Sequence, residues 1–90
     1  MTILEIIQLR AAREPLALLI DEIGESARTA GERVEFITMY RRVGLQTDLA
    51  VHIRRTEAAE GSRESDTGLR LASALRVHGL VEHTAWKELA

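Results

Sequence analysis

The sequence lacks cysteine altogether and has only one proline and three aromatic residues among its 90 residues. Without cysteine there is neither a disulfide nor a cysteine-ligated zinc site, so a small core must suffice alone or be completed by a partner. One domain is expected, because typical domains contain about 100 to 200 residues. No apolar run approaches the ~18 residues of a membrane span, and a basic leader is missing, so we expect a cytoplasmic protein without a membrane partner.

A large charge of one sign is also missing, because 12 basic residues nearly balance 14 acidic ones. The net charge of −2 argues against binding of a polyanion through overall charge. The charges are nevertheless uneven, since residues 1–35 carry a net −3 and residues 36–90 a net +1. Residues 36–55 contain four arginines against Asp48 alone, so a basic face on an acidic molecule remains an alternative.

Motifs typical of enzymes and cofactor-binding proteins are absent from the sequence. There is no glycine-rich phosphate loop, no His-Glu-x-x-His motif and no nucleophile elbow. Of the histidines His52, His78 and His83, the last two are five residues apart, which does not place two metal ligands on one helix face. We therefore expect no catalysis, no cofactor, no metal site and no small-molecule substrate.

Apolar residues recur at helical spacing along most of the chain, and no clear strand-like alternation of five or more residues stands out. A capping box from Thr2 to Glu5 begins the first predicted helix, and Pro15 favours the start of the second. Asp66 caps the last predicted helix and Gly79 ends it. The spacing predicts helices over residues 3–13, 15–28, 32–43, 47–57 and 67–78. The polar decad 57–66 is predicted to be a loop.

The predicted fold class is all-α, a single helical domain over residues 1–90. It would be a small bundle of five or six short helices, with at most a vestigial strand at residues 80–82. Residues 1–30 would form an N-terminal helical hairpin. Leu9 and Leu18 project away from the apolar stripes of its two helices, which makes them candidates for a partner or oligomer surface. The alternative is that single exposed leucines have no function, or that one helix is buried on two sides.

The segment LRLASALRVHGLVEH resembles the recognition helix and following strand of winged-helix DNA-binding domains. The preceding QTDLAVHIRR is similar to the second helix of that motif, and residues 36–43 would be its first helix. The resemblance covers residues 36–82 and lacks the wing hairpin after Glu82. It implies a helix-turn-helix-like region in which the helix at residues 67–78 contacts the major groove.

Two functional hypotheses follow from these patterns. The preferred one is a non-catalytic protein-interaction module, an adaptor or inhibitor of mobile-element origin that binds a larger protein or a second copy of itself through Leu9 and Leu18. The alternative is a DNA-binding transcriptional or replication regulator. Its candidate contact residues are Arg41, Arg42, Arg54, Arg55, Arg70, Ser73 and Arg76. The interaction module is preferred because solvated surface explains each arginine group equally well.

Overall fold

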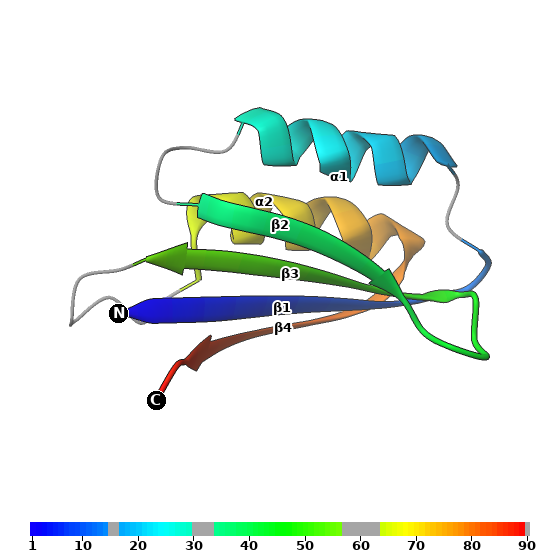
Figure 1. Ribbon diagram of the computed structural model, residues 1–90. Helices are drawn as coiled ribbons and strands as arrows, with labels where there is room; N and C mark the ends of the chain where they lie inside the picture. The colour runs from blue at the N-terminus through cyan, green and yellow to red at the C-terminus, as the bar shows by residue number, and fades with distance from the viewer. Residues whose placement is uncertain (15–16, 30–33, 57–63, 90) are drawn as a thin grey trace.

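The computed structural model describes residues 1–14, 17–29, 34–56 and 64–89. Its elements in chain order are β1 (Thr2–Ala11), α1 (Ala17–Thr29), β2 (Val34–Arg41), β3 (Asp48–Thr56), α2 (Asp66–Leu75), the 3-10 turn η1 (Arg76–His78) and β4 (Gly79–Lys87). The strands form one antiparallel sheet in the order β2-β3-β1-β4, and both helices lie over the same face of it (Figure 1). This βαββαβ arrangement is the ferredoxin-like topology.

The predicted all-α fold is therefore wrong, and so is the winged-helix resemblance. Two of the five predicted helices are confirmed, one as α1 and the other as α2 with η1, whereas the other three are strands β1, β2 and β3. The hairpin predicted for residues 1–30 is a strand followed by one helix. The vestigial strand predicted at residues 80–82 belongs to the full strand β4, which pairs along the length of β1. Most of the predicted loop, residues 57–63, lies outside the described residues.

The strand β1 shows why helical spacing was misleading. Its odd-numbered residues from Ile3 to Leu9 point toward the helices and are buried. Its even-numbered residues point away from the helices, yet Leu4 and Ile6 among them are apolar. The alternation of apolar and polar residues that marks a strand is hidden when its outer face also carries apolar residues. The same sequence then also matches the apolar spacing of an amphipathic helix.

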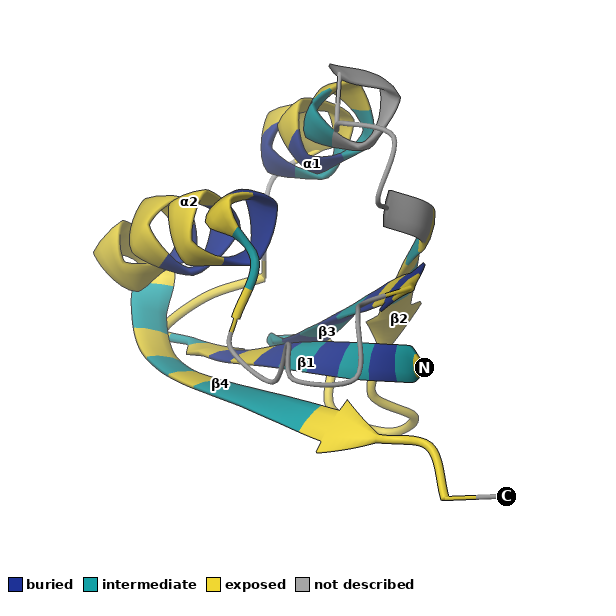
Figure 2. Ribbon diagram, turned by 90° about the vertical axis from the view of Figure 1, so that its left-hand side faces the viewer, coloured by how far each residue is buried: buried dark blue, intermediate teal, exposed yellow. Residues whose placement is uncertain are grey.

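The core lies between the sheet and the two helices (Figure 2). The central strands β1 and β3 supply its floor, and the helices close it from above. The buried core side chains on the helices are Leu19 and Ile23 of α1 and Leu71, Ala72 and Leu75 of α2. None of the described helices is long and apolar enough to cross a membrane.

Two local features set the ends of elements that surround the functional surfaces. Ser65, and not Asp66, is the N-cap of α2, since its Oγ accepts a hydrogen bond from the backbone N–H of Gly68 at 2.9 Å. The β2–β3 hairpin turns through Gly44, whose φ of 82° lies in the left-handed region that glycine adopts without strain. This hairpin curls away from the helices at one end of the sheet (Figure 1).

Candidate functional site

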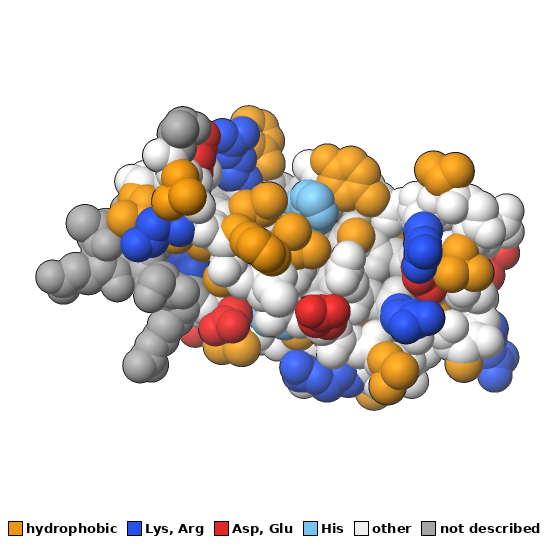
Figure 3. All heavy atoms as spheres, turned by 90° about the horizontal axis from the view of Figure 1, so that it is seen from below, with side chains coloured by type: hydrophobic (Ala, Val, Ile, Leu, Met, Phe, Trp, Pro, Cys, Tyr) orange, Lys and Arg blue, Asp and Glu red, His pale blue; other side chains and the backbone are white. Residues whose placement is uncertain are grey.

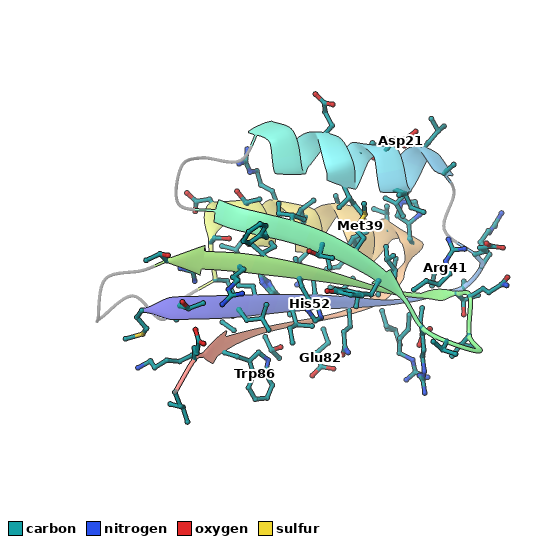
Figure 4. All side chains as sticks on the ribbon, in the orientation of Figure 1. Asp21, Met39, Arg41, His52, Glu82 and Trp86 are labelled. Carbon is teal, nitrogen blue, oxygen red and sulfur yellow. The ribbon has the colours of Figure 1, made fainter. Side chains whose placement is uncertain are left out.

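The sheet face opposite the two helices is not covered by any described element (Figure 1). We call it the open face. The strand register aligns its side chains in rows that cross all four strands. From β2 to β4 these rows are Phe36, Arg54, Leu4 and Trp86; then Thr38, His52, Ile6 and Thr84; then Tyr40, Ala50, Gln8 and Glu82. Glu82 and Trp86 are seen on this side of the sheet in Figure 4.

All three aromatic residues of the chain lie on the open face, and the core contains none of them. Phe36 is 62%, Tyr40 50% and Trp86 58% exposed. The Tyr40 ring packs against the His52 ring with 4.7 Å between centroids, and the Trp86 indole N–H donates to the Thr84 hydroxyl at 2.9 Å. Aromatic side chains are enriched in the cores of protein interfaces, because they bury a large area at low entropic cost.

The centre of the open face is apolar as well. Leu4, Ile6 and Ala50 are half-buried between the aromatic rings of the edge strands, and Leu80 at one end of β4 is 75% exposed. Figure 3 shows this side of the molecule, where hydrophobic side chains lie near a histidine and charged side chains of both signs are interspersed among them. An antiparallel sheet with water on one face normally carries polar residues there. The open face is therefore less polar than a solvent-exposed sheet face usually is.

The charged residues of this face have both signs. Arg54 lies 3.9 Å from Glu88, and Arg42 donates to Asp48 at 3.2 Å. Both arginines are more than half exposed, so each pair contributes little to stability. Because positive and negative groups alternate, the open face lacks the single-sign potential that a polyanion requires.

Two hollows indent the open face at its two ends. The larger one, about 560 Å³, lies beside the β2–β3 hairpin, and we call it the hairpin hollow. It is lined by Gln8, Leu9, Arg10, Tyr40, Arg41, Arg42, Asp48, Leu49, Ala50 and Glu82. The smaller one, about 300 Å³, is the Trp86 hollow. It is lined by Thr2, Leu4, Arg54, Trp86, Lys87 and Glu88.

On the other face of the sheet, a cluster of charged side chains is buried under α2. The carboxylate of Glu5 accepts a hydrogen bond from Arg55 Nε at 2.8 Å and one from the backbone N–H of Ser65 at 3.0 Å. His83 Nε2 lies 2.9 Å from the same carboxylate. The side chains of Glu5, Arg55 and His83 are 0%, 1% and 7% exposed. These contacts join β1, β3 and β4 to the first turn of α2.

A carboxylate that orients a histidine is also found in catalytic and metal-binding sites. Here the Glu5 side chain is fully enclosed, and the His83 side chain is only 7% exposed. A substrate has no access to the two carboxylate oxygens in this arrangement. Every buried polar side-chain atom of the described residues has a hydrogen-bond partner, so the cluster is internally complete. Its role in this structure is to hold α2 on the sheet.

The structure separates the two leucines that were candidates for a partner surface. Leu9 lies on the inner face of β1 and is 0% exposed, so it is a core residue that a partner does not reach. It was assigned to a surface because residues 3–13 were predicted to be helical, and that prediction is wrong. Leu18 lies on α1 and is 71% exposed, on the helical side of the molecule and not on the open face.

The candidate DNA-contacting residues are not brought together either. Arg55 is buried against Glu5, while Arg54 lies on the open face. Arg41 and Arg42 lie at the hairpin end of the sheet, and Arg41 pairs with Glu14 at 3.0 Å. The remaining three candidates, Arg70, Ser73 and Arg76, are exposed on α2 and η1. These residues therefore occupy separate surfaces and do not form one basic face.

Neither the aromatic cluster nor the buried charges were predicted from the sequence. Phe36 and Tyr40 were assigned to one helix face from their spacing of four residues. The same spacing also places two residues on one face of a strand, so it does not distinguish the two structures. A signal for β3 was present in the inward-facing Leu49, Val51 and Ile53, but Ala50 between them blurred the alternation. No local signal marks Glu5 as buried, because its partners are 50 to 78 residues away in the chain.

Comparisons with known proteins support the fold and nothing more specific. No family model matches the sequence, and no curated protein sequence matches it significantly. Among solved structures, the chain is similar to the structure of Rv0793 from Mycobacterium tuberculosis, with 18% sequence identity and a TM-score of 0.70. The match covers 100% of this chain and 97% of the other. At this identity the likeness establishes a shared fold.

Proposed function

We propose that this protein is a small, non-catalytic interaction module that binds through the open face of its sheet, and that the occupant of this face is a second copy of the chain. The observation that carries the proposal is the placement of all three aromatic residues, Phe36, Tyr40 and Trp86, on one exposed surface. Packing two such faces together is the usual sheet-on-sheet arrangement, with about 10 Å between the sheets.

The charge pattern supports a second copy as the partner. In a symmetric dimer each patch meets itself, so a suitable patch contains both signs of charge and a shared apolar centre. On the open face, the positively charged Arg10 and Arg54 and the negatively charged Glu82 surround the apolar Leu4 and Ile6. A strongly basic or acidic partner would instead favour a face of one sign.

The composition of the core is consistent with this assembly. The described core is aliphatic and holds neither an aromatic residue nor a disulfide, so a contact on the open face would add the apolar burial that a small core lacks.

The proposal predicts that one charge placed in the aromatic cluster separates the two copies. In Trp86→Glu, the new carboxylate would be desolvated in the interface, so the dimer should weaken by about 100-fold or more. The mass in solution, measured by light scattering or sedimentation between about 1 and 100 μM, should be that of a dimer for the unaltered protein and of a monomer for Trp86→Glu.

Two matched variants locate the interface. Val77→Glu adds the same charge at another exposed site, in η1 away from the open face, and it should leave the dimer intact. Leu18→Glu tests the outer side of α1 as a competing surface. A monomeric unaltered protein at 100 μM, or a dimer that Leu18→Glu breaks and Trp86→Glu does not, contradicts the proposal. A different protein that binds through Trp86 while the chain remains monomeric would also contradict the second copy as occupant.

A further inference from the structure

The hairpin hollow has the size and the lining of a small-molecule site. Its volume of about 560 Å³ lies within the roughly 300 to 1,000 Å³ typical of ligand pockets. Ala50 on β3 is the smallest side chain in its row across the sheet, and it lies between the larger Tyr40 on β2 and Gln8 on β1, so the hollow is deepest over β3. The curled β2–β3 hairpin closes the end of the hollow.

Three arginines line this hollow, and they are not equivalent. Arg42 donates to Asp48, whose side chain is only 14% exposed, and Arg41 pairs with Glu14 outside the lining. Arg10 forms no ion pair with any residue that the structure describes. Arg10 is the second-last residue of β1, and its side chain points to the open face next to the hairpin. Arg10 is therefore the cation that remains for a ligand.

The polar and apolar parts of the lining lie at different places in the hollow. Arg10 is near the hairpin end, while the Tyr40 ring and the Ala50 methyl group form an apolar surface one row further along the sheet. Glu82 lies on the β4 side and would repel an anionic group from that wall. The geometry points to a ligand with a flat apolar body against Tyr40 and Ala50 and an anionic group toward Arg10.

We propose that the hairpin hollow binds a small planar organic carboxylate, with Arg10 as the residue that pairs with its charge. A guanidinium is well suited to this role because its planar fork matches the two oxygens of a carboxylate. The site lies within one chain and does not depend on self-association. In a dimer formed through the open face, the second copy would close the hollow over the ligand.

Three probes that share one ring system and differ in charge test the ligand class. These are 2-naphthoate, the neutral 2-naphthamide and the cationic 2-naphthylmethylammonium, each titrated into the protein and followed by calorimetry and by backbone amide NMR shifts. We expect 2-naphthoate to bind about tenfold more tightly than the amide, and the ammonium probe to bind most weakly. The amides of Gln8, Tyr40 and Ala50 should shift, whereas those around the Trp86 hollow should not.

Three variants separate the charge from the shape of the site. Arg10→Gln should weaken 2-naphthoate about tenfold and leave the amide probe unchanged. Ala50→Leu should weaken both probes, because leucine fills the floor of the hollow while Arg10 remains. Glu82→Gln should strengthen 2-naphthoate by a few-fold, since it removes the repelling carboxylate. Arg76→Gln, an exposed arginine on η1, is the control and should change nothing.

The outcomes distinguish this site from self-association. Trp86→Glu should still bind 2-naphthoate, and if it does not, one chain does not contain the site and the inference is wrong. Equal affinity for the three probes, shifts centred on the Trp86 hollow, unchanged binding of 2-naphthoate by Arg10→Gln, or unchanged binding of both probes by Ala50→Leu would each overturn it. A monomeric protein that binds 2-naphthoate in this way would refute the proposed dimer and support the hollow.

Discussion

Glu5 is a carboxylate in the interior of a small protein, and each of its oxygens has a partner. One accepts from Arg55, and the other contacts Ser65 N–H and lies 2.9 Å from His83 Nε2. Removing a buried charge from water costs several kcal/mol, so such a pair adds little net stability over an apolar one. Its value is specificity, because a misplaced α2 or a shifted strand would leave these charges unpaired inside the core.

Removing one partner of a buried ion pair costs more stability than the intact pair contributes, because the other charge is left buried without compensation. Glu5→Gln should lower the free energy of unfolding by about 3 to 5 kcal/mol, because it leaves the Arg55 guanidinium buried without its counter-charge. Arg55→Met should lower the free energy of unfolding by a similar amount, because it leaves the Glu5 carboxylate buried without the guanidinium. The double variant should lose less than the sum, by about 1 to 3 kcal/mol, since neither charge remains. Urea unfolding followed by circular dichroism, at one fixed protein concentration, measures all three. Strictly additive losses would show that the two side chains are not coupled.

At the scale of an element, α2 is fixed to the sheet at its first turn. Ser65 caps the helix and also donates its N–H to Glu5, so one residue both begins the helix and docks it. Gly68 lies directly over the carboxylate, and a Cβ at this position would overlap Glu5 Oε1 and approach the His83 ring. The close approach of helix and sheet therefore requires glycine here.

Alanine substitutions at two helical glycines should have opposite effects. Gly24→Ala in α1 places its methyl group in open space, and it should stabilise the protein by about 0.5 to 1 kcal/mol through helix propensity. Gly68→Ala has the same propensity gain but must displace α2 or the Glu5 carboxylate, so a net loss of about 1 to 3 kcal/mol is expected. Thermal and urea unfolding of the two variants checks this. Stabilisation by Gly68→Ala would mean that the helix does not rest on Glu5.

At the scale of the whole molecule, the protein is a two-layer structure with its helices on one side only (Figure 2). Its core is aliphatic, and its aromatic side chains lie on the uncovered layer. A chain of 90 residues buries a smaller fraction of its surface than a larger domain does, so an additional contact on the open face would contribute a large part of its stability.

Folding should accordingly be linked to association. If a second copy binds the folded chain, the midpoint of thermal unfolding should rise with protein concentration, by mass action. Between about 2 and 200 μM we expect a rise of several degrees for the unaltered protein and a constant, lower midpoint for Trp86→Glu. Val77→Glu should follow the unaltered protein. A midpoint independent of concentration in the unaltered protein would argue against a dimer in this range.

Local patterns were sufficient for the two helices. In α1 the apolar positions 19 and 23 recur at helical spacing among acidic residues, and in α2 the core positions 71, 72 and 75 do the same before Gly79. These helices are exposed on their outer sides, so their period is visible in the sequence. The strands were hidden because their outer sides mix apolar and polar residues. Leu4, Ile6 and the aromatic residues are apolar at positions where an exposed strand usually has polar residues.

The amino-acid sequence by itself determined the absence of disulfides, the near balance of charge, both helices and the small number of aromatic residues. The pairing of strands far apart in the chain decided which side chains lie in the core and which lie on the open face. It brought Phe36, Tyr40 and Trp86 onto one face, placed Leu9 inside, and joined Glu5 to partners from three other parts of the chain. The physical reason is that hydrogen bonds between strands connect residues without regard to their separation in sequence, whereas helical contacts reach only three or four residues.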